Sequence, residues 1–129
     1  MILVDTGVLI DYTRTPSDPK LGGLFRTLPL AICGAVRAEI LHGSRNPRDR
    51  ARLVLLLDCF SQLAIPESHW DTIGDNLNAL RKSGVTIPFT DAIIATVALA
   101  NDIELWTRDT HFTLVQRVLP ALKLFIEPP

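Results

Sequence analysis

The stretch Thr90–Phe112, TDAIIATVALANDIELWTRDTHF, decides the fold because its first half reads as a buried helix. Across positions 92–100 the only polar side chain is Thr96, so the predicted helix is apolar on every side. A helix of this kind is buried within a protein rather than lying with one face in water. Thr90 is placed to cap its N-terminus.

The second half of this stretch predicts a strand. Asn101 and Asp102 end the helix, and Ile103–Thr107 is a short run with the β-branched and aromatic residues that are typical of strands. In a βαβ unit the helix starts at the carboxyl edge of the sheet and the next strand returns to that edge. We therefore expect Asp91, at the start of the helix, and Asp109, after the strand, to meet there.

The rest of the chain continues this alternation. We expect strands at 1–4, 30–33, 63–65, 103–107 and 122–126, and helices at 21–28, 35–41, 46–60, 68–84, 92–100 and from about 110 to 119. The polar stretch from Asp11 to Lys20 contains Pro16 and Pro19 and predicts a loop. Such alternation indicates an α/β domain with a mostly parallel central sheet of four or five strands and helices on both faces.

Composition supports one globular domain spanning residues 1–129. The chain has 129 residues, 47% of them hydrophobic, and a mean hydropathy of +0.24, which is enough for a sizeable core. No apolar run approaches the roughly 20 residues of a membrane span, and residues 1–5 lack the basic start of a signal peptide. We therefore expect a cytoplasmic protein. The net charge of −1 argues against a protein that coats nucleic acid nonspecifically.

Four carboxylates are predicted to converge at one edge of the sheet. Asp5 and Asp109 each follow an apolar strand, while Glu39 and Asp91 lie in the first turns of helices. A single Asp in such a place is usually a turn or capping residue. Four that share the carboxyl edge lie where open α/β sheets bind ligands, which favours a functional site.

Such a cluster needs a counter-charge. Two like charges about 4 Å apart repel by roughly 4 kcal/mol at an effective dielectric constant near 20. Protonation can relieve this repulsion, but a cluster of oxygen ligands without His or Cys matches the hard cations Mg²⁺ and Mn²⁺. Such an ion activates a bound water for in-line attack on a phosphoryl group. The sequence therefore predicts phosphodiester hydrolysis.

The same residues carry a resemblance to PIN-domain ribonucleases of the VapC toxin type, over nearly the whole chain. The matching blocks are Val4-Asp5-Thr6 with Leu9-Ile10, then Ala38-Glu39-Ile40-Leu41 with Gly43, then Asp91, Ile94-Ala95, Ala98, Leu105, Thr107, Asp109 and Phe112. The resemblance implies a PIN-like fold and an Mg²⁺- or Mn²⁺-dependent endoribonuclease.

The resemblance also implies roles for individual residues. The family's catalytic, metal-binding acids correspond to Asp5, Glu39, Asp91 and Asp109, and its supporting hydroxyl residues correspond to Thr6 and Thr107. Many relatives have a further acidic residue two positions after the last motif Asp, and His111 stands there in this chain.

Partners follow from the same resemblance. VapC-type toxins act on RNA, form homodimers and are held inactive by a cognate antitoxin that has a DNA-binding part and a segment covering the toxin groove. No DNA-binding element is visible in these 129 residues, so operator binding is expected to come from the partner.

Other functions were weighed against this one. A haloacid-dehalogenase-type phosphatase needs a second Asp two residues after the first, where this chain has Gly7, and a response-regulator receiver lacks its acidic pair and late Lys here. Two alternatives stay open: an RNA-processing nuclease without an antitoxin, and a catalytically silent PIN-like module that binds RNA or protein. Retention of all four carboxylates speaks against the silent module.

Several other side chains have simpler interpretations. Cys33 and Cys59 are predicted to be reduced, buried thiols, and Trp70 and Trp106 to lie in the core. The remaining acidic residues are expected to be solvated or capping, with Asp11 nearest to the site in sequence. Surface or structural roles are expected for His42, His69 and His111, with RNA contact open for His111. The basic residues Arg45, Arg48, Arg50 and Arg52 form a solvated helix face or a phosphate-contacting rim.

Overall fold

The computed structural model describes residues 1–14 and 18–129, and these form one five-stranded sheet with the order β3-β2-β1-β4-β5. Every pair of neighbouring strands is parallel; Leu3 of β1, for example, lies between Ala31 of β2 and Leu105 of β4. The strands are β1 (Ile2–Val4), β2 (Leu30–Cys33), β3 (Ser61–Leu63), β4 (Glu104–Trp106) and β5 (Lys123–Leu124). The predicted α/β fold with a parallel central sheet is confirmed.

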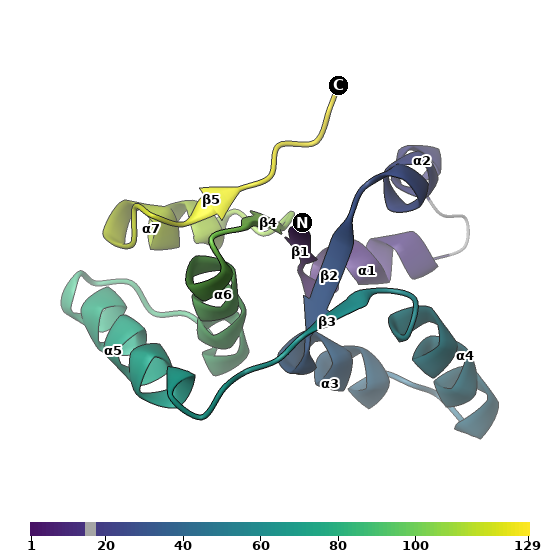
Figure 1. The fold of residues 1–129 in the computed structure, drawn as a ribbon, viewed down its shortest axis with the longest axis horizontal. Helices are drawn as coiled ribbons and strands as arrows, with labels where there is room; N and C mark the ends of the chain where they lie inside the picture. The colour runs from purple at the N-terminus through teal and green to yellow at the C-terminus, as the bar shows by residue number, and fades with distance from the viewer. Residues whose placement is uncertain (15–17) are drawn as a thin grey trace.

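Helices cover both faces of this sheet. Figure 1 shows α5, α6 and α7 to one side of β1 and β2, and α1, α2 and α4 to the other. The helices are α1 (Thr6–Thr13), α2 (Pro19–Thr27), α3 (Gly34–His42), α4 (Pro47–Leu57), α5 (His69–Lys82), α6 (Phe89–Asn101) and α7 (His111–Val118). None of the helices within residues 1–14 and 18–129 is long and apolar enough to cross a membrane.

The strand order creates a crevice between β1 and β4. From β1 the chain proceeds to β2 and then β3 in one direction across the sheet, whereas from β4 it proceeds to β5 in the other. Because such crossovers are right-handed, the two sets of connecting helices lie on opposite faces. The carboxyl ends of β1 and β4 therefore form a topological switch point, which is where α/β sheets bind ligands.

The buried helix predicted from the sequence is α6. Every residue from Ala92 to Ala98 is buried, because α6 packs against α5, α3 and β4. Thr96 keeps its hydroxyl satisfied in this position by donating to the carbonyl of Ala92 and accepting from the Asn76 side chain. The helix ends at Asp102, whose φ of 51° gives the left-handed C-cap that stops it. The predicted stop is confirmed.

Several local predictions were wrong. The loop predicted from Asp11 to Lys20 is wrong at both ends, because residues 11–13 belong to α1 and Pro19 is the first residue of α2. Residues 15–17 of that predicted loop lie outside the part of the chain that the structure describes. The helix α6 begins at Phe89 with Pro88 as its N-cap, so Thr90 is a helical residue and not the cap. Pro88 has an extended backbone and makes no side-chain cap bond, and the Thr90 hydroxyl contacts Glu39 instead.

Two predictions of burial also failed. Trp70, in the first turn of α5, is 41% exposed, whereas Ile73 and Leu80 of the same stripe are buried. Cys59 is exposed after the end of α4, and only Cys33 is buried. Trp106 is fully buried in β4, as predicted, and its ring packs against those of Phe25 and Phe125.

The C-terminal tail is fixed to the switch point by ion pairs. Arg108, just after β4, donates to both carboxylate oxygens of Glu127 at 2.8 Å and also contacts Asp11 and Asp18. Trp106 adds a third donor to Glu127 through its indole N–H at 3.1 Å. These contacts, with Arg108 first, lower the pKa of Glu127 from its ordinary 4.5 to about 2, and the pKa of Arg108 is raised.

This network predicts an acid-sensitive contribution to stability. A carboxylate whose pKa is depressed in the folded state stabilises the protein above its unfolded pKa and loses that effect as the pH falls. Glu127→Gln should therefore lower the unfolding free energy at neutral pH by about 1 kcal/mol, a value discounted for solvent screening. The difference should vanish as the pH falls from 4.5 to about 2. Urea unfolding over this range checks it, with Glu67→Gln on the exposed surface as the matched control.

Candidate active site

Asp5 lies at the carboxyl end of β1, on the floor of the crevice. Its backbone N–H donates to the carbonyl of Trp106 at 2.9 Å, which extends the β1–β4 ladder by one residue and places Asp5 beside Thr107. One carboxylate oxygen accepts the Thr6 N–H at 2.8 Å, as the N-cap of α1, and the other accepts the Thr107 hydroxyl at 2.7 Å. Asp5 is buried, with 6% of the residue exposed, and these two donors hold its carboxylate in place.

Glu39 reaches the same place from α3, which begins directly after β2. Its Oε1 accepts the hydroxyl of Thr6 at 2.7 Å, and its Oε2 lies 3.5 Å from the hydroxyl of Thr90 on α6. Thr6 thus contacts two of the predicted acids, through its N–H to Asp5 and its hydroxyl to Glu39. The position of Thr90 inside α6, rather than at its cap, is what turns its hydroxyl toward Glu39.

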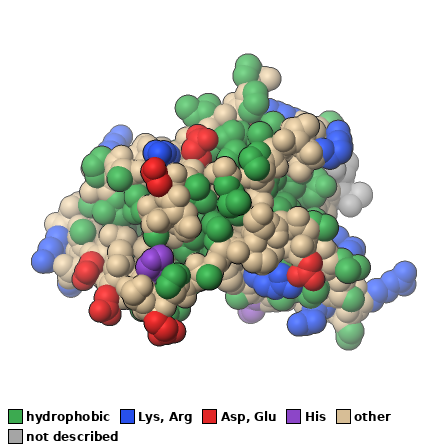
Figure 2. Space-filling view, in the orientation of Figure 1, with side chains coloured by type: hydrophobic (Ala, Val, Ile, Leu, Met, Phe, Trp, Pro, Cys, Tyr) green, Lys and Arg blue, Asp and Glu red, His purple; other side chains and the backbone are tan. Residues whose placement is uncertain are grey.

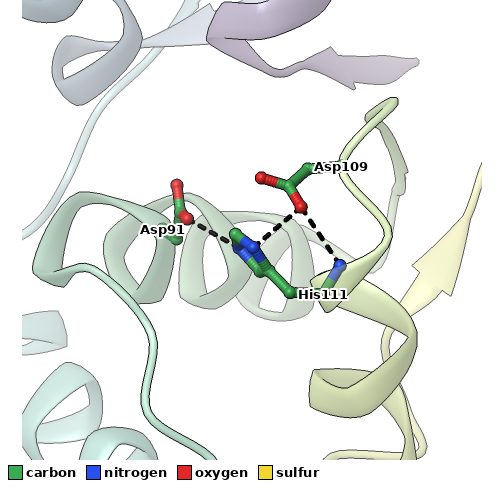
Figure 3. Close-up of side chains that lie close together, drawn as sticks. All are labelled: Asp91, Asp109 and His111. Atoms are coloured by element: carbon green, nitrogen blue, oxygen red, sulfur yellow. Dashed lines mark hydrogen bonds and ion pairs between the residues drawn. The ribbon is translucent and has the colours of Figure 1, made fainter.

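Asp91 and Asp109 meet around a histidine. Asp91 lies in the first turn of α6 and Asp109 three residues beyond β4, and the ring of His111 lies between them (Figure 3). Its Nε2 is 2.7 Å from Asp91 Oδ2, and its Nδ1 is 2.8 Å from Asp109 Oδ1. The predicted meeting of Asp91 and Asp109 at the sheet edge is confirmed by this shared neighbour.

Burial and like-charge repulsion disfavour the ionised form of two carboxylates in the crevice, Asp5 and Asp91. Burial raises the pKa of Asp5, against the hydrogen bonds from Thr107 and Thr6, and the charges of Glu39 and Asp109 raise it further. Burial and the charge of Asp5 likewise raise the pKa of Asp91, while His111 lowers it. Raised pKa values show that these carboxylates are less stable as anions here than in water. A cation placed among them would relieve that cost.

All four predicted acids line one open cavity of about 490 Å³. The cavity is lined by Asp5, Thr6, Gly7, Ile10, Asp11, Arg14, Glu39, Asp91, Arg108, Asp109 and Thr110. Of the two basic residues in this lining, Arg108 is occupied by Glu127, Asp11 and Asp18, so it offers little charge to the cluster. The carboxylates therefore face a space that is open to solvent and to a ligand.

Sequence reasoning missed one member of the site. The prediction of a cluster without histidine was wrong, because ligand-type atoms of Asp91, Asp109 and His111 lie within 4.8 Å of one another. The signal was present in the spacing: His111 is two residues after Asp109, and the first turn of α7 folds it back so that its own N–H donates to Asp109 at 3.1 Å. Asp11, by contrast, pairs with Arg108 at the rim of the cavity.

Comparison with known proteins identifies the family. The PIN domain family matches residues 2–118. The chain is also 30% identical, over 112 residues, to "Ribonuclease VapC1" of Methanocaldococcus jannaschii, an alignment that covers 86% of this chain and 78% of the relative. The chain belongs to the VapC ribonucleases of the PIN-domain family. The resemblance found in the sequence is thereby confirmed.

Solved structures agree with this VapC-type PIN fold. The structure of VapBC2 from Rickettsia felis bound to a promoter DNA fragment matches with a TM-score of 0.79 and 22% identity, covering 97% of this chain and 98% of the other. A toxin–antitoxin complex from Klebsiella pneumoniae matches with a TM-score of 0.70 and 23% identity, covering 99% and 100%. At these identities the agreement concerns the fold.

The donor set of this PIN domain fits a divalent metal ion. Carboxylate oxygens from Asp5, Glu39, Asp91 and Asp109 line the cavity, and raised pKa values at Asp5 and Asp91 show that the site gains from a cation. Ligand-type atoms of Asp91, Asp109 and His111 lie within 4.8 Å of one another.

Proposed function

We propose that this VapC-type PIN domain is a metal-dependent endoribonuclease that hydrolyses RNA phosphodiester bonds and acts as the toxin of a toxin–antitoxin pair. Mg²⁺ or Mn²⁺ would be held by Asp5, Glu39, Asp91 and Asp109. The observation that carries the proposal is the lining of one cavity by all four carboxylates at the β1–β4 switch point. Family membership supports the same reaction.

The protein's own residues prepare this site before a ligand arrives. A divalent ion bound here would lower the pKa of a coordinated water and stabilise charge on a phosphoryl oxygen. Thr107 and the Thr6 N–H fix both oxygens of Asp5, and the Thr6 hydroxyl holds Glu39 beside it. Because these carboxylates are oriented by the fold, little reorganisation is needed when the site is filled.

A basic surface beside the crevice suits the RNA backbone. Arg14 lines the active-site cavity; its side chain is 71% exposed and lies 3.8 Å from Asp11. It also lines a neighbouring groove of about 500 Å³ between α1, α3 and α4, together with Arg45 and Arg52. Figure 2 shows Lys and Arg side chains gathered over α4 at the lower right. Arg45 and Arg52 both pair with Asp49 in this groove, at 3.7 Å and 2.8 Å, so Arg14 offers the more available charge for a phosphate.

RNA cleavage with and without metal tests the proposal. Protein stripped of metal should leave a structured RNA intact in EDTA and cleave it once Mg²⁺ or Mn²⁺ is in excess. A silent RNA-binding module would retard the RNA in a gel and never cut it. Absence of cleavage with either ion, across a panel of cellular RNAs, would contradict the enzymatic function.

An antitoxin is the partner that the neighbouring groove would accept. The groove shares Ile10, Arg14 and Glu39 with the active-site cavity, and it adds the apolar side chains of Ile40 and Leu53. A segment of the partner could lay apolar side chains along these helices and insert an Arg or Lys among the four carboxylates. Arg fits best because its planar guanidinium binds carboxylates through two parallel hydrogen bonds. The partner would also carry the DNA-binding part.

Substitution of the inserted Arg by Ala should separate inhibition from binding. Apolar contacts would keep the complex together, so the dissociation constant should rise by a smaller factor than the cleavage activity of the complex. Both are measured on the co-purified pair, whose mass also shows whether the toxin is a homodimer. If no partner can be recovered with the protein, the RNA-processing nuclease without an antitoxin becomes the better interpretation.

A further inference from the structure

Arg108 lies in the chain between two residues of the candidate site. Thr107, before it, donates its hydroxyl to Asp5, and Asp109, after it, is one of the four proposed metal-binding acids. The Arg108 side chain lines the same cavity as those acids. A guanidinium is therefore placed at the wall of a cavity whose carboxylates gain from a cation.

Three carboxylates outside the set of four hold this guanidinium. Glu127 accepts from two of its nitrogens, from Nε to Oε2 and from Nη2 to Oε1, both at 2.8 Å. Nη1 donates to Asp11 at 3.1 Å, and Nη2 donates to Asp18 at 3.3 Å. The contact with Glu127 is a paired one with the two shortest distances, so it contributes most to the direction of the Arg108 side chain.

Glu127 is itself anchored by donors other than Arg108. Its Oε2 accepts the indole N–H of Trp106 at 3.1 Å, and its Oε1 lies 3.8 Å from the Nζ of Lys20 in the first turn of α2. Trp106 is fully buried in β4. In Figure 1 the C-terminal tail runs from β5 toward the side of the molecule where α1 and α2 lie. The Glu127 carboxylate is thus attached to the core independently of Arg108.

We propose that Glu127 is a positioning residue that keeps the Arg108 guanidinium out of the metal site. The inference rests on the metal-dependent function proposed above. Without Glu127, Arg108 would keep only its longer contacts with Asp11 and Asp18, and its guanidinium would compete with the divalent ion for the four carboxylates. A guanidinium binds carboxylates through a planar fork, so it can occupy the oxygens that an ion needs. The C-terminal tail therefore sets the metal affinity of the site through Arg108.

Calorimetric titration of the full-length protein with Mn²⁺ tests this role. The Mn²⁺ dissociation constant should rise by about tenfold in Glu127→Ala, the size of effect seen when the residues around a metal site are removed. Adding Arg108→Gln to that variant should bring the constant back close to the native value, because the competing cation is gone. Melting curves verify that each variant is folded. If Glu127→Ala is unfolded, Glu127→Gln takes its place with a smaller expected rise.

A charge-matched control separates displacement by Arg108 from a general effect of charge. Arg14→Gln in the Glu127→Ala background removes one positive charge from the lining of the same cavity but leaves Arg108 in place. Our proposal predicts that Arg108→Gln restores Mn²⁺ binding and that Arg14→Gln restores it much less. Equal recovery by both would show that only the field of Glu127 matters, and no recovery by Arg108→Gln would show a merely structural role; either result overturns the inference.

The native protein separates this inference from the proposed function. An unchanged Mn²⁺ dissociation constant in Glu127→Ala, with metal-dependent RNA cleavage by the native protein, would overturn the role of Glu127 alone. No Mn²⁺ binding and no metal-dependent cleavage by the native protein would overturn the proposed function and this inference with it.

Discussion

Asp109→Asn is expected to reduce RNA cleavage by about 100-fold or more while leaving the fold intact. The amide keeps the shape of the side chain and can still accept the N–H of His111, but it removes a negative charge from the ion's ligand set. The Asp109 side chain is 50% exposed, so the substitution disturbs little packing. Initial rates on a defined RNA with saturating Mn²⁺ measure the loss, and circular dichroism with a melting curve verifies the fold.

Two comparisons make this result specific. Asp75→Asn, on the exposed surface of α5 outside the cavity, should cleave like the native protein. Asp5→Asn, Glu39→Gln and Asp91→Asn should each behave like Asp109→Asn, because the four carboxylates are proposed to hold the same metal site. Full cleavage by both Asp5→Asn and Asp109→Asn would remove the metal mechanism.

The second large effect concerns metal-linked stability. Without metal, Asp5→Asn should melt at the same temperature as the native protein or a few degrees higher, because a buried, repelled charge is removed. An ion at 100 times its dissociation constant should then stabilise the native protein by about 2.7 kcal/mol, and the variant clearly less. Differential scanning fluorimetry in EDTA and in Mn²⁺ measures both changes on the same samples.

The sign of the pH dependence supplies an internal control. The pKa of Asp5 is raised in the folded state, so its ionisation costs stability as the pH rises from the unfolded value of 3.8 through the folded pKa. The advantage of Asp5→Asn without metal should therefore grow over that range and then level off, opposite to the behaviour expected for Glu127→Gln. A strongly destabilised Asp5→Asn without metal would indicate that Asp5 is mainly the structural N-cap of α1.

Sequence patterns predicted the parts of this molecule that depend on local physics. The apolar run of α6 and the short strands at 2–4, 30–33 and 104–106 are visible because burial leaves few polar positions in them, Thr96 and Glu104 among them. Asp5 and Asp109 each follow a strand, so in a parallel sheet both lie at its carboxyl edge. Glu39 and Asp91 lie in the first turns of helices that start at the same edge. All four indeed line one cavity.

Features that depend on packing across the fold could not be predicted. Trp70 is exposed although Ile73 and Leu80 of the same helical stripe are buried. The contact between Thr90 and Glu39 follows from α6 starting at Phe89, two residues before the start that a Thr90 cap predicts. The contacts of His111 depend on the first turn of α7 folding back over Asp109. Residue spacing alone carries no information on such orientations.

The new ends of the RNA product test the central claim most directly. Hydrolysis by a metal-activated water should give, at the earliest times in H₂¹⁸O, a linear terminal phosphate that carries one solvent oxygen, with no 2′,3′-cyclic phosphate. The reaction should stop in EDTA and in Asp109→Asn. A 2′,3′-cyclic phosphate formed at the same rate with or without EDTA would show attack by the RNA's own 2′-hydroxyl, and the four-carboxylate metal site would not be the catalyst.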